Sequence, residues 1–394
     1  MEALIGTHAD KVRIITPQDG AHYFFAYYDM RATQDENSPH LAHRVPFMDH
    51  LPTAEDEAEL GTLRDGVFTP FATTTAWNFQ QGAMLQYHPT LRDTVYYNAC
   101  IDGRFVTVTH DIASGAKKFT DRATACVSPD GKWGLGVNFG KIYDFRPGYG
   151  YAGDDNPQRH MDAPYDDGVF LVDMETGISR QIIHYDTLRA AAGFEDDQKI
   201  LVNHITFNTA SDCFVMLVRN FKRPGEKGGW LTSMVIGDLQ GNVHTVLCKT
   251  LVSHYNWMDG ENIIVYCIAH PDEPAATYRI HVDTGETEQY RMAYNESGNN
   301  NRGNRDIHCN LSPDGNYIIG DGYPIDGYRH LIAYSLRTGE SRDLLAAKSI
   351  APPIIDIRCD LHARFVFGGK YISFDTTHNN RREIAMLPAS VLDF

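Results

Sequence analysis

Short apolar stretches recur along almost the whole chain, separated by polar turns. Segments such as 94–98 (TVYYN), 168–173 (GVFLVD), 213–218 (CFVMLV) and 371–375 (YISFD) are rich in β-branched and aromatic residues and are bounded by Gly, Asp, Asn or Pro. This pattern is typical of β-strands. A single short helix is expected, over 186–192. The hydrophobic pattern therefore predicts an all-β protein.

The turns between the expected strands also recur. The tetrapeptide SPDG occupies 128–131 and again 312–315, and a second Gly-containing turn follows one or two strands later, as at 175–177 and 337–339. Glycine supplies the positive φ that tight hairpins require. A unit with two hairpin turns has four strands, and repetition of such a unit every ~40–60 residues is typical of a β-propeller.

A polar residue precedes the first hairpin of each unit. His204, His254, His308 and His362 follow one another at intervals of 50, 54 and 54 residues. Towards the N-terminus the corresponding positions are Arg122, Gln81 and Tyr28. Seven such positions predict a seven-bladed propeller that forms a single domain over 1–394. We expect an insertion at 146–167, and a strand at 12–16 that completes the last blade.

Propeller geometry brings these positions together, because the first strand of every blade lines the central channel. We therefore expect the four histidines to meet at one end of the axis. Asp360 and His362 would point the same way from a strand. With His308 they would form a His/Asp/His metal cluster, and His254 would be a fourth ligand or a catalytic base. The alternative is that each histidine only makes structural hydrogen bonds.

Further candidate residues follow from the same geometry. Arg219 leaves a strand beside His204, where it could neutralise a substrate carboxylate or pair with an acidic loop. Aromatic side chains could stack on sugar rings or simply pack their loops. The remaining candidates are Tyr143 and His204 as catalytic residues, and Arg146, Tyr149, Gln81, Trp77, Arg122 and Tyr323 as substrate-binding residues.

Composition limits the possible partners. The 394 residues include 35 basic and 51 acidic side chains, giving a net charge of −16, which disfavours binding to nucleic acid or to an anionic membrane surface. An acidic substrate would need a local cationic cleft. There is no apolar run of about 18 residues and no signal-peptide pattern. The seven cysteines are scattered, as free thiols are. We expect a cytoplasmic protein.

Three segments resemble a known group of enzymes. They are HCNLSPDGNYIIGDGYP (308–324), SHYNWMDGENIIVY (253–266) and RCDLHARFVFGGKYISFDTTHNNRREI (358–384). They are similar to the propeller polysaccharide lyases, above all the oligogalacturonate lyases and more distantly the ulvan and rhamnose–glucuronate lyases. The resemblance is strongest over about 200–390.

The resemblance implies a divalent metal on the axis, held by histidines and a glutamine. His308 and His362 match metal ligands, Asp360 falls where the family has another histidine, and the glutamine has no match. An aspartate there favours a harder ion such as Mn²⁺ or Ca²⁺. Arg219 and His254 fall near the family's catalytic Arg and His.

The function expected from the resemblance is β-elimination in short oligosaccharides that contain uronic acid. His254 would take the C5 proton, Arg219 would neutralise the carboxylate, and Tyr143 would be the acid or an alternative base. Two alternative functions are also consistent with the sequence: a non-catalytic binding scaffold, and a propeller enzyme of different chemistry such as a hydrolase or isomerase. A hydrolase needs two carboxylates ~5–10 Å apart, for which Asp321 and Asp360 are the obvious pair.

Overall fold

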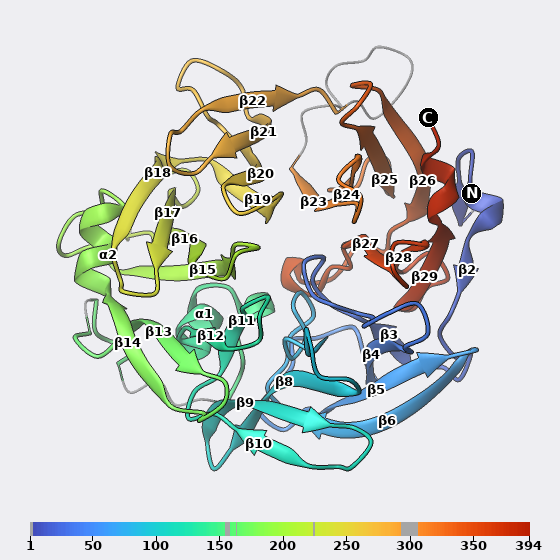
Figure 1. Cartoon of the computed structure of the whole chain (residues 1–394), viewed down its shortest axis with the longest axis horizontal. Helices are drawn as coiled ribbons and strands as arrows, with labels where there is room; N and C mark the ends of the chain where they lie inside the picture. The colour runs from blue at the N-terminus through green and yellow to red at the C-terminus, as the bar shows by residue number, and fades with distance from the viewer. Residues whose placement is uncertain (1–2, 154–157, 163, 224, 293–305) are drawn as a thin grey trace.

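The computed structural model describes residues 3–153, 158–162, 164–223, 225–292 and 306–394. Seven antiparallel sheets stand in a ring around a central axis, as Figure 1 shows. Six sheets have four strands and one has five. The prediction of an all-β, seven-bladed propeller is confirmed.

Each blade runs from an inner strand at the axis to an outer strand at the rim. The inner strands are β3 (His22–Phe24), β7 (Gln86–Tyr87), β11 (Thr124–Val127), β15 (Ile200–Phe207), β19 (Val252–Trp257), β23 (Ile307–Leu311) and β27 (Arg364–Val366). The second strands are β4 (His40–Val45), β8 (Thr94–Ile101), β12 (Trp133–Gly136), β16 (Cys213–Asn220), β20 (Asn262–Cys267), β24 (Tyr317–Gly322) and β28 (Tyr371–Thr376).

The outer half of each blade is built the same way. The third strands are β5 (Ala58–Arg64), β9 (Arg104–Asp111), β13 (Gly168–Asp173), β17 (Thr232–Asp238), β21 (Ala276–His281), β25 (Tyr328–Ser335) and β29 (Glu383–Pro388). The outer strands are β6 (Val67–Thr74), β10 (Lys117–Phe119), β14 (Ser179–His184), β18 (Val243–Thr250), β22 (Thr287–Tyr290), β26 (Ser341–Lys348) and β2 (Arg13–Ile14).

The N-terminal segment ties two C-terminal blades together. β2 pairs with β29 as the outer strand of the last blade, through Arg13 opposite Met386. β1 (Leu4–Ile5) adds a fifth strand to the blade before it by pairing with β26. Strand β2 accordingly lies beside β29 at the rim of the ring (Figure 1). The ring is therefore closed by hydrogen bonds between its first and last segments.

Apolar side chains fill the spaces between neighbouring blades. Val215 and Leu217 of β16 pack in one cluster with Tyr255 and Trp257 of β19 and are completely buried. Burial of this kind is the main stabilising contribution in a propeller whose blades share few backbone hydrogen bonds. It fixes the angle between blades and so the positions of side chains at the axis.

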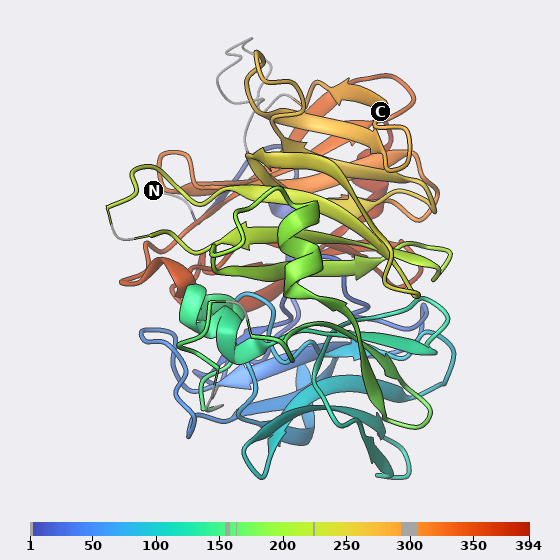
Figure 2. The same ribbon diagram turned by 90° about the vertical axis from the view of Figure 1, so that its left-hand side faces the viewer.

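Two α-helices lie in the described part of the chain. α2 (Tyr185–Ala191) agrees with the expected helix to within one residue and packs against the outer side of the ring. α1 (Phe139–Phe145) was not predicted. The side chain of Asn138 caps it by accepting a hydrogen bond from the backbone N–H of Lys141. Figure 2 shows α1 at one face of the ring.

Short 3₁₀ segments complete the structure: η1 (Ala9–Lys11), η2 (Pro147–Tyr149), η4 (Ile355–Ile357) and η5 (Ala389–Leu392). Of these, η2 and η4 contact each other, and η2 follows α1 directly. Residues 154–157 and 163 of the expected insertion lie outside the described residues. Among the described helices, none has the length and apolar character needed to cross a bilayer.

Candidate functional site

The four repeated histidines meet at the axis, as the sequence predicts. The ring centroids of His254 and His308 are 4.0 Å apart, those of His308 and His362 4.5 Å, and those of His204 and His254 6.2 Å. Each comes from a different blade. Residues ~50 positions apart in sequence thus form one continuous cluster of imidazoles.

Local irregularities of the inner strands turn these side chains towards one another. His204 is the extra residue of a β-bulge, since Asn203 pairs with Leu217 and Ile205 with Met216. Its φ is +58°, a value that few non-glycine residues adopt. Bulges of this kind re-aim side chains next to functional sites. His362 also has a positive φ, +44°. Strain at two of the four histidines indicates that their orientation matters to the molecule.

The segment that follows β3 crosses the axis beneath the histidines. Its Tyr27 ring stacks on His204 with 5.1 Å between centroids, and the Tyr27 hydroxyl lies 3.3 Å from Nε2 of His204. The Tyr28 hydroxyl donates to the backbone oxygen of Tyr255, on the inner strand β19 of the fifth blade. The backbone oxygen of Tyr28 accepts from the side chain of Asn310. This segment narrows the channel, and the rings of Tyr27 and Tyr28 pack against the histidine cluster.

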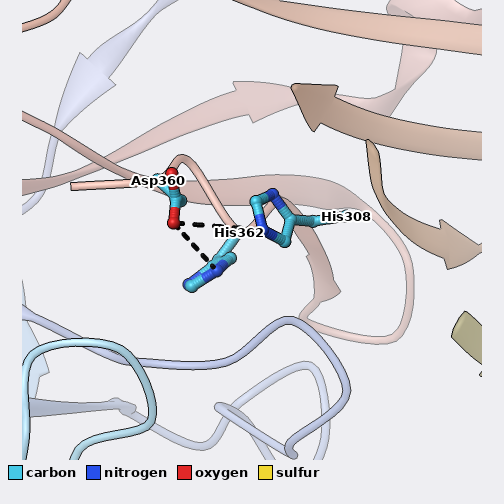
Figure 3. Close-up of side chains that lie close together, drawn as sticks. All are labelled: His308, Asp360 and His362. Atoms are coloured by element: carbon cyan, nitrogen blue, oxygen red, sulfur yellow. Dashed lines mark ion pairs between the residues drawn. The ribbon is translucent and has the colours of Figure 1, made fainter. Parts of the chain in front are cut away.

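His308, Asp360 and His362 form a possible metal centre, shown in Figure 3. Oδ2 of Asp360 lies 3.9 Å from Nε2 of His308 and 3.8 Å from Nε2 of His362. Within the described part of the chain, Nε2 of His308 and Nε2 of His362 are buried and have no hydrogen-bond partner, while Oδ2 of Asp360 lies 2.8 Å from Nε of Arg358. Buried polar atoms are normally satisfied, so two unsatisfied ring nitrogens that converge on a carboxylate fit a bound cation.

The surroundings of His308 and His362 place an oxygen acceptor beside Nδ1 of each ring, which favours the tautomer with the proton on Nδ1. Nδ1 of His362 lies 3.0 Å from the backbone oxygen of Ala26 and donates to it, which leaves the Nε2 lone pair facing Asp360. Nδ1 of His308 lies 3.3 Å from Oδ1 of Asp321. In metal-bound histidines, the ring nitrogen that does not face the metal typically lies beside a hydrogen-bond acceptor.

The prediction that Asp360 and His362 share a strand is wrong. Both precede β27, which begins at Arg364, and lie in an extended loop. Their side chains nevertheless meet, because the loop turns at the positive φ of His362.

Two arginines hold the Asp360 carboxylate. Nη2 of Arg329 lies 2.6 Å from Oδ1, and Nε of Arg358 lies 2.8 Å from Oδ2. Burial alone would raise the pKa of Asp360, but the charges of Arg329 and Arg358 outweigh it and hold the pKa well below its usual value. The two guanidinium groups therefore favour the ionised form of Asp360. The pKa of His308 is raised, because Asp321 and Asp360 outweigh the opposing effect of burial.

His254 and Asp306 form a histidine–carboxylate pair at the edge of the cluster. Nδ1 of His254 lies 2.7 Å from Oδ1 of Asp306, whose Oδ2 accepts from the hydroxyl of Ser253. Burial lowers the pKa of His254 to about 4 despite the opposing charge of Asp306. His254 is thus neutral at physiological pH, with its proton on Nδ1 and its Nε2 lone pair free. The sequence analysis missed Asp306, which lies two residues before the repeated position of His308.

A group of cationic side chains lies beside His204. Nη1 of Arg219 donates to Asn203 at 2.6 Å, while its Nε is buried without a hydrogen-bond partner among the described residues. Burial and the nearby Arg146 lower the pKa of Arg219 to about 10. Burial and Arg219 together keep the pKa of His204 well below its usual value. Two guanidinium groups, those of Arg146 and Arg219, thus lie near His204, although the whole chain carries −16.

Tyr149 lies among these cations because of two flanking glycines. A side chain at Gly148 would come within 2.6 Å of the backbone oxygen of Asp356, and one at Gly150 within 2.1 Å of the backbone nitrogen of Tyr143. The close approach lets the Tyr149 hydroxyl accept from Nη2 of Arg358 at 2.9 Å. The Tyr149 ring meets His204 edge-on at 5.3 Å, and the guanidinium of Arg146 lies 4.5 Å from its centre.

Trp230, which the sequence analysis did not single out, is an exposed aromatic at the rim of this site. Its side chain is 40% exposed, and the guanidinium groups of Arg146 and Arg219 each lie 5.8 Å from its ring. Phe145 of α1 supports it edge-on. A solvent-facing indole beside two arginines is suited to stacking on a sugar whose carboxylate the arginines bind. It was missed because it lies in an irregular loop without a repeat position.

The other predicted residues divide into two groups. Gln81 lies in the site, with Nε2 3.4 Å from Nδ1 of His204, and the half-buried Tyr323 ring lies 5.6 Å from the Arg358 guanidinium. Trp77 is 1% exposed, packs on Phe24 and Phe79, and donates to the backbone oxygen of Asp56.

Arg122 and Tyr143 also lie away from the histidines. The Arg122 guanidinium lies 3.6 Å from the ring of Phe170, in a different cleft beside Asp121 and Asp167. Within the described ranges, no hydrogen bond or ring contact joins Tyr143 of α1 to a histidine of the cluster. Trp77, Arg122 and Tyr143 are therefore left out of the site proposed below.

The cluster is more enclosed than the sequence suggests. His308 and Asp360 are almost completely buried, and His204 is half-buried. His204 and His254 line a cavity of 210 Å³ that extends along the inner strands of four blades, together with Tyr27 and Gln81. The open side of the site is formed by the half-buried Arg146, Tyr323 and Asp306, with Trp230 at the rim.

Comparison with known proteins supports the fold and leaves the chemistry to be argued from the site. No family model matches the sequence, and no match is found among the curated proteins. Among solved structures, an oligogalacturonate lyase in complex with manganese covers 100% of both chains with a TM-score of 0.66 at 16% identity. The oligogalacturonate lyase of Vibrio parahaemolyticus covers 98% of both chains with a TM-score of 0.63 at 12% identity.

The same fold also occurs in a protein of another class. The tricorn protease matches 96% of this chain over 34% of its own length, with a TM-score of 0.52 at 11% identity. A propeller by itself does not define an activity. The chain is a seven-bladed β-propeller with the complete fold of the oligogalacturonate lyases and a possible His/Asp metal centre on its axis.

Proposed function

We propose that this protein is a lyase that cleaves short uronic-acid-containing oligosaccharides by β-elimination at the axial site. One observation carries the proposal. A neutral, carboxylate-paired histidine, a buried arginine with an unpaired Nε and a His/Asp/His cluster all converge at one end of the axis. The reaction requires a base, a partner for the substrate carboxylate and a means of stabilising the charge that develops on it.

His254 is the proposed base. The C5 proton of a uronide is only weakly acidic, so the base must be unprotonated and held in place. Asp306 fixes the His254 proton on Nδ1, which directs the Nε2 lone pair away from the carboxylate. The low pKa of His254, about 4, keeps that nitrogen free at neutral pH.

Arg219 is the proposed partner of the substrate carboxylate. Its Nη1 is anchored on Asn203, and its buried Nε is available to a ligand. A planar guanidinium can bind both carboxylate oxygens, and this interaction strengthens as negative charge accumulates in the enolate-like transition state. Arg146 lies in the same region, with its Nε paired to Oδ1 of Asp356 at 3.0 Å.

Tyr149 is the proposed acid that assists departure of the leaving oxygen, in place of Tyr143. Its oxygen accepts from Arg358, so its own proton is free to be donated. Tyr149 also contacts His204, whose ring lies 6.2 Å from that of the proposed base His254.

His308, Asp360 and His362 are the proposed ligands of a divalent metal, with Mn²⁺ as the first ion to test and Ca²⁺ as the second. Such an ion, when bound, would supply Lewis-acid stabilisation of the substrate carboxylate. The mixed nitrogen and oxygen donors suit Mn²⁺, and one of the structural relatives is a manganese complex. Three protein ligands would leave coordination positions open.

The site does not support a hydrolase that works through two carboxylic acids. Asp321 is 0% exposed and accepts hydrogen bonds from two backbone amides, while Asp360 is held by Arg329 and Arg358. The pKa of Asp360 is held well below its usual value, opposite to what a general acid needs, and both carboxyl groups are buried.

A substrate panel tests the proposal. The protein, supplied with Mn²⁺, is incubated with 4-linked oligogalacturonides, oligoglucuronides and oligomannuronides, and with neutral oligosaccharides as controls. β-Elimination creates a conjugated double bond, so ultraviolet absorbance should rise with at least one uronide and with no neutral sugar. Hydrolysis without a rise in absorbance would contradict the proposal.

A further inference from the structure

Asp321 lies where the two blades that carry the proposed metal ligands meet. It stands on β24, directly opposite His308 of β23 in the same blade. Its side chain reaches into the next blade, where Oδ2 accepts from the backbone N–H of Leu361 and Oδ1 from that of His362, both at 2.9 Å. The Asp321 carboxylate therefore links the blade that carries His308 to the loop that carries His362.

The same carboxylate faces the ring of His308. Its Oδ1 lies 3.3 Å from Nδ1 of the His308 ring, within ion-pair distance. With its proton on Nδ1, His308 presents the Nε2 lone pair to Asp360, 3.9 Å away. Without an acceptor at Nδ1, either ring nitrogen of His308 could carry the proton. In the tautomer with the proton on Nε2, that nitrogen could not bind the metal.

A third contact couples Asp321 to the remaining ligand. Arg329 spans the two carboxylates, with Nη1 3.8 Å from Oδ2 of Asp321 and Nη2 2.6 Å from Oδ1 of Asp360. Asp321 is completely buried, and burying a carboxylate is costly unless it is fully compensated. Its compensating partners are the backbone amides of Leu361 and His362, the ring of His308 and the guanidinium of Arg329.

We infer that Asp321 is the positioning residue that assembles the metal centre, by fixing the tautomer of His308 and clamping the backbone at His362. The inference rests on the proposed function, since it assumes that the cluster binds a divalent ion. Asp321 itself is not a ligand: its two oxygens already face backbone amides and His308. Loss of an outer-shell partner of this kind costs about 10–100-fold in metal affinity.

The test measures Mn²⁺ affinity directly, by isothermal titration calorimetry on the full chain without any substrate. Asp321→Asn keeps the size of the side chain but places an N–H₂ against a backbone donor or His308. Asp321→Ser, which retains one small acceptor, serves if the first variant is poorly folded. The matched control is Asp167→Asn, because Asp167 is equally buried and pairs with Lys141 and a backbone amide far from the cluster.

We expect wild-type protein and Asp167→Asn to bind one Mn²⁺ with equal affinity, and Asp321→Asn to bind about 10–100-fold more weakly. Equal binding by Asp321→Asn and the wild type would overturn the positioning role while leaving the metal centre intact. If the wild type binds no Mn²⁺ or Ca²⁺, both the metal part of the proposed function and this inference are wrong.

Discussion

Nδ1 of His254 lies 2.7 Å from Oδ1 of Asp306, and this contact decides which nitrogen of the proposed base faces the substrate. The two residues are 52 positions apart and belong to neighbouring blades. The pairing gives the imidazole a fixed tautomer and a fixed plane.

Replacing Asp306 should lower the rate more than the affinity. Asp306→Asn removes the charge and allows the wrong tautomer of His254, so we expect kcat to fall about 10²-fold with little change in KM. His254→Ala should lower kcat at least as far. The measurement is initial rate by ultraviolet absorbance on the best uronide of the panel. An Asp306→Asn variant with wild-type kcat would show that the pair has no part in the reaction.

The acid limb of the pH–rate profile should lie unusually low. The pKa of His254 is lowered to about 4, so the base stays unprotonated well below the ordinary histidine range. We expect kcat/KM to fall with acidification only near pH 4 and to be flat from pH 5 to 7 on the acidic side. A limb centred near 6.5 would identify a different, unperturbed base.

Arg219 should be essential through its geometry as well as its charge. Arg219→Ala removes the proposed carboxylate partner and should reduce kcat/KM by about 10²–10³-fold. Arg219→Lys keeps a positive charge without the planar fork and should recover only a small part of the activity. Turnover of Arg219→Ala at the wild-type rate would remove this residue from the mechanism.

Trp230 should contribute to substrate binding and not to the chemical step. Its ring is 40% exposed at the rim, beside Arg146 and Arg219. We expect Trp230→Ala to raise KM about tenfold, equivalent to about 1.4 kcal/mol, with kcat nearly unchanged. Trp230→Phe retains an aromatic face and is the matched control. Equal KM for wild type and Trp230→Ala would exclude a stacking role.

Folding stability should decrease between neutral and mildly acidic pH. Burial lowers the pKa of His40 and His43 to about 3 and that of His88 to about 4. Below pH 6.5 the unfolded chain takes up protons at these histidines while the folded chain does not, so the free energy of unfolding falls as pH falls towards 4. The slope is at most about 1.4 kcal/mol per pH unit for each histidine.

Urea titrations at pH 7.5, 6.5, 5.5 and 4.5 measure this change. We expect stability to be constant above pH 6.5, where the histidines are neutral in both states, and to decrease steadily below it. His40→Gln, which keeps a polar side chain near Ser373, should flatten the dependence. Stability that does not change from pH 7.5 to 4.5 would contradict the buried, neutral state of these histidines.

The fold was predictable because the same local sequence features recur in each blade. Glycine turns and β-branched runs recur blade by blade, and the spacing of His204, His254, His308 and His362 gives both the blade count and the convergence at the axis. The same regularity explains why the sequence predicted that His308 and His362 lie close together, since they occupy equivalent positions in adjacent blades.

The remainder of the site depends on irregular features that a repeat does not predict. Asp306 and Trp230 lie in loops, and Tyr27 comes from a segment that leaves its strand and crosses the channel. Tyr149 was singled out, but its contact with Arg358 depends on the close approach at Gly148 and Gly150. Trp77 was misinterpreted because a polar-aromatic sequence is as typical of a buried turn as of a sugar platform.

The most direct test of the central claim is the ultraviolet absorbance of uronide digests by wild-type protein and by a His308→Ala/His362→Ala double variant, each with added Mn²⁺. The account predicts rising absorbance for the wild type on at least one 4-linked uronide, and no rise for the double variant. Absence of any unsaturated product from every uronide with the Mn²⁺-supplied wild type would contradict it.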